Sequence, residues 1–378
     1  MAAVGIICEY NPFHRGHEKQ IAQIKHDRPQ DAVVCLMSGL FVQRGHPAVF
    51  NPAVRARAAL QSGADLVLEL PVNVSLSSAE GFADGAVEIF SRIGVDSLCF
   101  GAETHRTKEL ERAAEVLLSE VFPDVLGRYL DGGLSFPAAR AGAAGELGVA
   151  PELLSRPNNI LAVEYAKAVR RRGNAMTLMP IHRPGDYHDQ EADLENPSAT
   201  ALRRLILSAG DWMPYVPAGA AELFRQAVPH SLHWGERAIL GALRTMGEEE
   251  FEALPYGSEG LWRKLMEQSR RQRTLEEILT AVKSKRYTRS RLDRMVMCAF
   301  LGLDQRLMKC PAPYVRILGC SDRGRSFLRQ LDQCGYLVNA GKRMRDDWQT
   351  LEDRLLRLYG LFACEPESPV PSARVILR

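Results

Sequence analysis

Short, almost purely apolar segments alternate with amphipathic stretches through the first two hundred residues, and this alternation constrains the fold more than any other feature. Buried strands are predicted at residues 4–8, 32–37, 65–70, 97–100 and 176–181. Helical periodicity marks the stretches at 53–62, 78–92, 107–118 and 160–171. Strands that are apolar on both faces and separated by helices are typical of a parallel sheet covered on each side. We therefore predict a doubly wound, Rossmann-like α/β domain.

The strand pattern fades beyond about residue 208, and helical periodicity replaces it. Helices are predicted at 218–228, 234–245, 261–270, 274–282, 289–303 and 347–359. We therefore predict an α/β domain over residues 1–208, with a helical insertion at about 122–154, and a mainly helical region over 209–378. The length of 378 residues fits this division, because domains average roughly 150 residues.

Composition argues against several classes of protein. The longest apolar run, residues 295–303, is about half of the roughly 18 residues that a membrane-spanning helix needs. The eight cysteines form no CxxC pair, which favours reduced thiols in the cytoplasm over a disulfide framework or a zinc site. The net charge of +2 does not predict a nucleic-acid partner, which would need a local basic patch. We therefore predict no metal site and no membrane contact, and the sequence identifies no protein partner.

The most informative segment, residues 5–17, reads GIICEYNPFHRGH and leads from a buried strand to an expected helix start. Histidines three residues apart there share a face, so His14 and His17 can both point into the crevice at the strand ends. Gly16 allows a ligand close to the backbone, and the amides of a helix N-terminus favour phosphate. Two alternatives stay open: a metal site, which lacks supporting carboxylates or cysteines, and ordinary capping or surface histidines.

A second motif follows the fifth predicted strand. Ser198, Thr200 and Arg203 lie at an expected helix start, where two hydroxyls and a guanidinium can contact the β- and γ-phosphates. The alternative is a plain helix cap with a solvent-exposed arginine. The two motifs in this order resemble the HxGH nucleotidyltransferase superfamily. That resemblance implies attack on the α-phosphate of ATP with pyrophosphate leaving, and Mg²⁺ is expected with the nucleotide.

Longer blocks make the resemblance more specific. The sequence is similar to the tRNA(Met) cytidine acetate ligase family in the segments 5–17, 37–48, 63–71, 100–103, 157–168, 181–189, 198–203 and 284–294. Membership implies that ATP and acetate form acetyl-adenylate. It also implies that the acetyl group passes to N4 of the wobble cytidine in the anticodon arm of elongator tRNA(Met), giving N4-acetylcytidine. The implied catalytic residues are His14, His17, Ser198, Thr200 and Arg203.

The resemblance also implies a set of ATP-binding residues. It carries over to Gly101, Asn158, Arg183 and the stretch Ile7, Cys8, Glu9, Tyr10, Asn11, Pro12, Phe13, His14, Arg15, Gly16, His17, Glu18, Lys19 and Gln20. Gly101 would admit the adenine or ribose near a strand end, or it is a simple turn glycine. Asn158 could equally be the N-cap of a helix that begins near residue 160. Arg183 follows the fifth strand, and we expect it to contact phosphate rather than solvent.

Three positions depart from the family pattern. Arg15 stands where asparagine usually precedes the glycine of HxGH, Leu40 where asparagine usually follows MSG, and Pro52 where a lysine is expected. None of them is one of the paired histidines, so the resemblance implies that ATP activation is intact. The departures bear instead on the acetate pocket and on the surface that faces tRNA.

A local basic patch occurs between residues 263 and 294, where eleven lysines and arginines accompany four acids. Basic side chains beside an aromatic ring suit phosphate contacts and stacking on an unpaired anticodon base. We predict tRNA contacts from Lys283, Lys285, Arg286, Tyr287, Arg289 and Arg291. A solvated helix face would look the same in sequence.

Two other functions stay open on the residues alone. A protein of the same superfamily could transfer AMP to a phosphorylated metabolite without contacting RNA. It could also be a catalytically silent RNA-binding protein that keeps only the fold. Acetate-dependent turnover of ATP separates both alternatives from the ligase.

Overall fold

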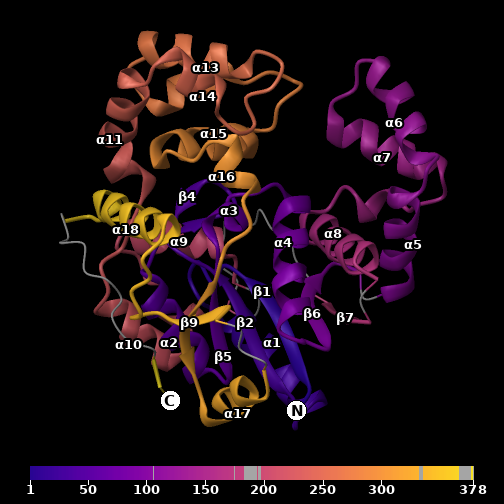
Figure 1. Cartoon of the computed structure of the whole chain (residues 1–378), viewed down its shortest axis with the longest axis vertical. Helices are drawn as coiled ribbons and strands as arrows, with labels where there is room; N and C mark the ends of the chain where they lie inside the picture. Colours follow the sequence, from indigo (N-terminus) through magenta and orange to yellow (C-terminus); the bar gives the residue numbers. More distant parts are fainter. Residues whose placement is uncertain are drawn as a thin grey trace.

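An eight-stranded sheet lies at the centre of the molecule (Figure 1). The computed structural model describes residues 1–104, 106–173, 175–182, 194, 197–331, 335–365 and 376–377. The five predicted strands are confirmed as β1 (Ala3–Cys8), β2 (Ala32–Ser38), β5 (Leu66–Leu70), β6 (Ser97–Ala102) and β7 (Thr177–His182). They run parallel in the order β5-β2-β1-β6-β7. The strand order reverses between β1 and β6, which is where a doubly wound sheet opens its ligand crevice.

The last part of the chain returns to this sheet. β8 (Val315–Cys320) pairs antiparallel with β5, and β9 (Leu337–Asn339) and β10 (Ile376–Leu377) pair parallel with β8. Because β8 runs antiparallel to β5, its first residues lie at the edge of the sheet where β5 ends. The boundary at residue 208 stays a prediction, and β8 shows that the chain beyond it contributes to the central sheet.

Side chains of the central strands alternate between two cores. In β1, Ala3 and Ile7 contribute to one core, whereas Val4, Ile6 and Cys8 contribute to the other. Successive side chains of a strand point to opposite faces, so a strand covered on both faces is apolar throughout. The first core faces α4 (Ala79–Arg92), α5 (Thr107–Leu118) and α8 (Pro157–Arg171). The second faces α1 (Arg15–Asp27) and α2 (Pro52–Gln61).

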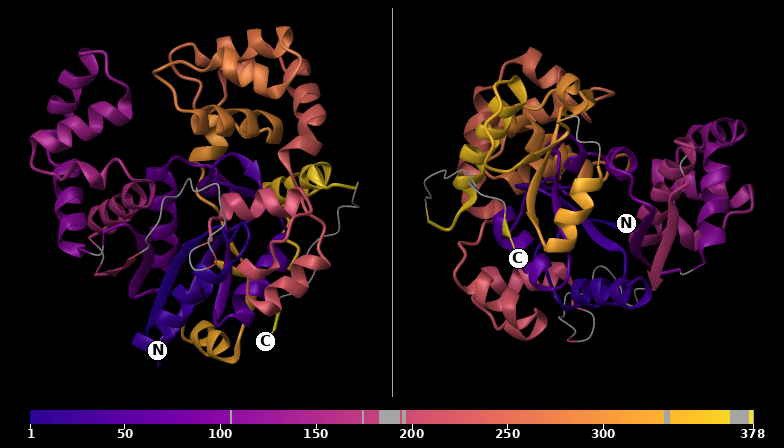
Figure 2. Two further views of the ribbon diagram at one scale, coloured as in Figure 1. Left: turned by 180° about the vertical axis from the view of Figure 1, so that it is seen from behind. Right: turned by 60° about the horizontal axis from the view of Figure 1, so that its bottom comes forward.

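Further helices extend beyond the carboxyl edge of the sheet. The predicted insertion forms α6 (Phe122–Asp131), α7 (Phe136–Glu146) and the 3₁₀ turn η1 (Pro151–Leu153). The remaining helices and 3₁₀ turns are α3 (Val72–Ser75), α9 (Ala199–Leu207), η2 (Met213–Tyr215), α10 (Ala218–Arg225), α11 (Leu232–Thr245), α12 (Glu248–Glu252), α13 (Leu261–Arg271), α14 (Leu275–Val282), α15 (Arg289–Leu301), α16 (Gln305–Lys309), α17 (Asp322–Gln330), α18 (Asp347–Tyr359) and η3 (Gly360–Phe362). Figures 1 and 2 show α13–α15 on one side of this edge and α6–α7 on the other.

The helices and cysteines of the structure can be compared with the predictions made from composition. Every helix within the described ranges is too short or too polar to cross a bilayer. The seven cysteines in those ranges are free, and five of them are buried. Burial raises the pKa of the Cys99 and Cys298 thiols to about 12, so these side chains stay protonated at neutral pH.

Candidate active site

Both histidines of the HxGH motif cap the first helix. His14 is the N-cap residue of α1, and its Nδ1 accepts the Gly16 N–H at 3.1 Å. The Nδ1 of His17 accepts the His14 N–H at 3.3 Å and completes a capping box. A Cβ on Gly16 would lie 3.0 Å from His14 Cε1, so glycine leaves room for the His14 ring. The capping alternative is thus confirmed, and it leaves the phosphate role of the two rings a prediction.

The capping bonds also determine which ring nitrogen carries the proton. An Nδ1 that accepts a hydrogen bond places the proton of a neutral imidazole on Nε2, so each ring has an Nε2–H donor. The two rings stack with centroids 3.6 Å apart, and Tyr10 and Phe13 pack against His17 at 4.8 and 5.6 Å. His14 is completely buried, whereas His17 keeps part of its surface. His17 is therefore the more accessible donor for a phosphate.

The second predicted motif meets the first. Ser198 caps α9, and its Oγ accepts the Ala201 N–H at 3.4 Å. One Nη of Arg203 donates to the Asn11 carbonyl at 2.7 Å, and the other donates to Thr200 Oγ1 at 3.0 Å. Residues 192 positions apart thus share one site at the end of β1. The alternative of a solvent-exposed arginine is wrong for Arg203, because a backbone carbonyl of the first motif binds it.

Two of the predicted nucleotide residues lie beyond β1 in the order of the sheet, Gly101 on β6 and Asn158 on α8. Gly101 lies near the end of β6, opposite Ile181 of β7. Asn158 is the second residue of α8, whose N-cap is Arg156, so the N-cap alternative for Asn158 is wrong. Its Nδ2 donates to Glu103 Oε1 at 2.8 Å. Arg183 lies outside the described residues.

Glu103 is a residue of this site to which sequence reasoning assigned no role. Its carboxylate accepts the Asn159 N–H at 2.7 Å and the Asn158 N–H at 3.3 Å, so it occupies the N-terminus of α8. A carboxylate is stabilised there by the helix dipole and the unpaired amides. The available signal is an acid placed directly after a buried strand, in the block FGAE.

A hairpin connects this site with the helical region. β3 (Phe41–Val42) and β4 (His46–Pro47) follow β2, and the Gln43 N–H donates to Glu9 Oε1 at 2.9 Å. Gly45 turns the hairpin at φ +80°, and a Cβ there would lie 2.6 Å from the backbone of Asp293 and Arg294 in α15. Glycine therefore supplies both the left-handed turn and the close approach of α15.

His46 lies where the two predicted regions adjoin. Burial lowers the pKa of His46 to about 4, and the positive charges of Arg203, Arg44 and Arg289 lower it as well. The ring is therefore neutral at pH 7. Arg203 belongs to the predicted phosphate site and Arg289 to the predicted tRNA surface, so the two predicted sites are close enough for their charges to act on one side chain.

The predicted tRNA-binding residues begin in the loop after α14. Lys283 and Lys285 are exposed to solvent. Arg286 forms an ion pair with Glu259 at 2.9 Å, and the Tyr287 hydroxyl donates to the same carboxylate at 2.9 Å. The loop thus presents two lysines next to a ring and a guanidinium that one carboxylate holds.

The two arginines in the first turn of α15 make contacts within the protein. Arg289 binds both oxygens of Glu276, at 2.8 and 2.7 Å. Arg291 donates to the Tyr256 carbonyl at 2.8 and 3.0 Å and lies 4.8 Å from the centre of the Tyr287 ring. A phosphate would compete with these partners, so RNA binding by the set stays a prediction.

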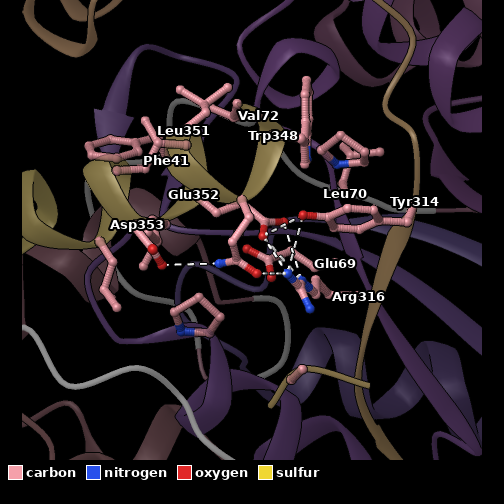
Figure 3. Close-up of a pocket in the computed structure, with 18 of the residues that line it drawn as sticks. Phe41, Glu69, Leu70, Val72, Tyr314, Arg316, Trp348, Leu351, Glu352 and Asp353 are labelled. Atoms are coloured by element: carbon pink, nitrogen blue, oxygen red, sulfur yellow. Dashed lines mark hydrogen bonds and ion pairs between the residues drawn. The ribbon is translucent and has the colours of Figure 1, made fainter. Parts of the chain in front are cut away.

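Two of the three departures from the family pattern line a separate cavity. Leu40 and Pro52 contribute to a cavity of about 180 Å³ at the carboxyl ends of β2 and β5, and Figure 3 shows its polar and aromatic lining. Arg15, the third departure, is exposed at the first residue of α1. The departures thus change this cavity and the protein surface, and they leave the capping box in place.

Comparison with known proteins identifies the family. A family model described as HIGH Nucleotidyl Transferase matches residues 1–360. A protein called tRNA(Met) cytidine acetate ligase from Acetivibrio thermocellus is 34% identical over 363 residues, covering 88% of this chain and 86% of the relative. One with the same name from Kosmotoga olearia is 36% identical over 354 residues, covering 88% and 83%. The chain belongs to the tRNA(Met) cytidine acetate ligase family. The resemblance in the sequence is thereby confirmed.

Solved structures of the family confirm the fold. The apo form of Thermotoga maritima TmcAL superposes with a TM-score of 0.91 at 27% identity, over 100% of this chain and 99% of that chain. The same protein bound with alpha-thio ATP superposes with a TM-score of 0.88, over 100% of both chains. The fold of this acetate ligase family member is therefore that of a relative whose structure contains an ATP analogue.

Proposed function

We propose that this chain is an ATP-dependent ligase that activates acetate as acetyl-adenylate, releases pyrophosphate, and transfers the acetyl group to N4 of the wobble cytidine of elongator tRNA(Met). Family membership supports the overall reaction, because the relatives that cover 88% of this chain are called tRNA(Met) cytidine acetate ligase. The observation that carries the proposal in this chain is the 2.7 Å hydrogen bond from Arg203 to the Asn11 carbonyl, which joins the two motifs that are predicted to bind phosphate.

The donors around the end of β1 fit a nucleoside triphosphate. The amides at the start of α1, the Nε2–H groups of His14 and His17, and the guanidinium of Arg203 all donate hydrogen bonds, and phosphate oxygens accept them. Within the described ranges, no group of three or more His, Cys, Asp or Glu could hold a metal ion. Mg²⁺ bound together with ATP would neutralise part of the charge on the phosphate oxygens.

Acetate activation needs positioning and charge stabilisation more than a reactive side chain. A carboxylate oxygen of acetate attacks the α-phosphorus, a new P–O bond forms, and the bond to pyrophosphate breaks. His14 and His17 donate to the α-phosphate oxygens as negative charge grows there. Arg203, with Ser198 and Thr200, faces the leaving pyrophosphate. Each well-placed donor of this kind contributes roughly 10²–10³ in rate.

Acetyl transfer follows at the same mixed anhydride. The cytidine N4 attacks the carbonyl carbon, the N–C bond forms, and AMP leaves with the bridging oxygen and its electron pair. N4 releases one proton as the amide forms. The N4 lone pair is delocalised into the ring, so correct placement of the base contributes much of the rate. The residues from Lys283 to Arg291 would hold the anticodon arm beside the site, since α15 docks on the hairpin that touches Glu9.

Incubation with ATP, labelled acetate and total tRNA, followed by nucleoside analysis, tests the proposal. We expect labelled N4-acetylcytidine that requires all three components, together with acetate-dependent exchange of pyrophosphate into ATP. A metabolite adenylyltransferase would exchange pyrophosphate only with a phosphorylated acceptor and not with acetate. A silent RNA-binding protein would bind tRNA without consuming ATP. Either result would reject the ligase function.

A further inference from the structure

The cavity at the carboxyl ends of β2 and β5 is lined by six stretches of the chain, and Figure 3 shows the side chains that face it. Aromatic and polar groups line it, including Phe41, Glu69, Tyr314, Arg316, Trp348 and Glu352. Its volume is about 180 Å³. A protein cavity of about 150 Å³ binds benzene, so this cavity has room for a nucleobase.

The two guanidinium groups that line the cavity form ion pairs with carboxylates. The Nη2 of Arg316 donates to Glu352 Oε2 at 2.6 Å and to the side-chain Oε1 of Gln349 at 2.7 Å. Arg343 binds both oxygens of Asp353, at 2.8 and 2.7 Å. With these charges already paired, an anion such as acetate or phosphate would gain little from either arginine. The two arginines therefore favour a neutral ligand over an anion, and Lys342 is the other cationic residue of the lining.

Glu69 supplies the polar group that a ligand can still engage. Its half-buried carboxyl group takes part in none of the hydrogen bonds found among the described residues, and it lies against Gly39, where any Cβ would collide with it. Burial and the nearby Glu352 raise its pKa to about 7, although Arg55 and Arg316 act in the opposite direction. Such a group both accepts and donates hydrogen bonds near neutral pH, so it matches a ligand edge that carries a donor next to an acceptor.

The cavity adjoins the proposed nucleotide site. The fully buried Arg55 donates to the carbonyl of Glu9 at 2.6 Å and to that of Ser38 at 2.9 Å. It also donates to the carbonyl of Gly39, which lines the cavity, and so links the β1 turn to the cavity. Strand pairing places three residues in one row: Cys8, Met37 and Glu69. Two strand spacings, about 10 Å in total, separate Cys8 from Glu69 in that row. The end of β1 and the cavity therefore lie about 10 Å apart along the same edge of the sheet.

We propose that this cavity receives the base of the cytidine that is acetylated, with Phe41 and Trp348 against its ring and Glu69 facing its N4 amine and N3. Cytosine is a single six-membered ring whose N4–H and N3 form the donor and acceptor pair that a carboxyl group matches. RNA-binding proteins commonly take unpaired loop bases into pockets with aromatic walls. The inference rests on the proposed function for the identity of the RNA. It goes beyond that function by naming Phe41, Glu69 and Trp348 as the residues that bind and select the base.

An anticodon stem–loop RNA with pyrrolocytosine at the wobble position tests this placement on the full chain without ATP or acetate. Emission of the analogue reports stacking of the wobble base, and the anisotropy of a dye at the 5′ end reports binding of the whole RNA. Glu69→Met removes the carboxyl group without breaking an internal hydrogen bond, and Glu69→Gln keeps an acceptor oxygen. Trp348→Leu removes an aromatic wall. Trp212→Leu is the matched control, because Trp212 packs near Phe224, outside the cavity.

We expect the wild-type chain to quench the analogue. Glu69→Met and Trp348→Leu should lower the quenching at saturating protein concentration by about threefold or more, while the protein concentration at the anisotropy midpoint changes by about threefold or less. Glu69→Gln should retain most of the quenching, and Trp212→Leu all of it. The proposal is overturned if RNA binds without quenching, if both cavity variants behave like the wild type, or if the RNA does not bind. Acetate-dependent exchange of pyrophosphate into ATP measures the activation step separately. A chain that quenches the analogue but shows no such exchange would contradict the proposed ligase function and leave the placement of the base standing.

Discussion

Replacing each HxGH histidine by the residue best suited to its capping position separates the structural role from the catalytic one. His14→Asn places a preferred N-cap residue before Gly16, and its Oδ1 can accept the bond that Nδ1 now accepts at 3.1 Å. His17→Gln places the usual capping-box residue at N3, where Nδ1 now accepts at 3.3 Å. Both variants keep a cap on the 13-residue helix α1. Both also remove the imidazole Nε2–H, and the amide N–H₂ that replaces it is displaced from that position because the amide oxygen occupies the capping site.

The two roles predict different magnitudes. Loss of a helix cap costs about 1 kcal/mol, so the matched variants should unfold within about 1 kcal/mol of the wild type, whereas His14→Ala should lose at least that amount. Loss of a donor to the α-phosphate should cost roughly 10²–10³ in rate, which is about 2.7–4 kcal/mol of transition-state stabilisation. Since His14 is completely buried and His17 is partly exposed, His17→Gln is the cleaner of the two.

Acetate-dependent exchange of labelled pyrophosphate into ATP measures the catalytic effect, and denaturant unfolding measures the structural one. We expect slow exchange from a stable protein. If both matched variants exchange within about threefold of the wild type, the histidines act only as caps and the reasoning is refuted. Slow exchange accompanied by a large loss of stability would also contradict it, because the caps would then account for the whole effect.

Three further predictions follow from the same contacts. Arg203→Met removes the bond to Asn11 and should slow pyrophosphate exchange by about 10²-fold with a modest loss of stability, and exchange at the wild-type rate would contradict the assignment. Changing the exposed Lys283 and Lys285 to glutamate should raise the KM for tRNA by about tenfold and flatten its salt dependence while leaving exchange unaltered, and an unchanged KM would exclude this loop from the tRNA surface. Glu69→Gln should gain stability relative to the wild type as the pH rises from 4.5 to 7, because the raised pKa of about 7 favours the protonated carboxyl group in the folded state. Above pH 7 the difference in unfolding free energy should level off at about 3 kcal/mol or less. Denaturant unfolding at pH 5 and pH 8 measures this difference, and an equal difference at both pH values would count against the burial of that charge.

The central sheet could be predicted because its information is local. Strands that are buried on both faces need continuous apolar runs, and β1 and β2 consist of them. β8 is less visible, because Arg316 interrupts its apolar run. That charge is tolerated in the sheet only because Glu352 binds it, and Glu352 comes from α18. From sequence alone, the segment around β8 can therefore be predicted only to contain both strand and helix.

The candidate site could be predicted where a single turn builds it. The strand, the turn and the capping box of α1 follow one another along the chain, so their geometry is readable from local sequence. Glu103 could not be assigned a role in this way, because the amides that it caps belong to Asn158 and Asn159, 55 and 56 residues later. The cavity around Glu69 was missed for the same reason, since 13 of its 22 lining residues lie beyond residue 310.

The fate of oxygen from acetate tests the central claim most directly. If a carboxylate oxygen attacks the α-phosphorus and N4 then attacks the carbonyl carbon, that oxygen stays on phosphorus when AMP leaves. A reaction with tRNA, ATP and acetate carrying ¹⁸O on both oxygens should therefore yield AMP with one ¹⁸O and N4-acetylcytidine with one ¹⁸O, as read by mass spectrometry. Unlabelled AMP, or ¹⁸O in inorganic phosphate, would contradict activation of acetate at the site between the two motifs.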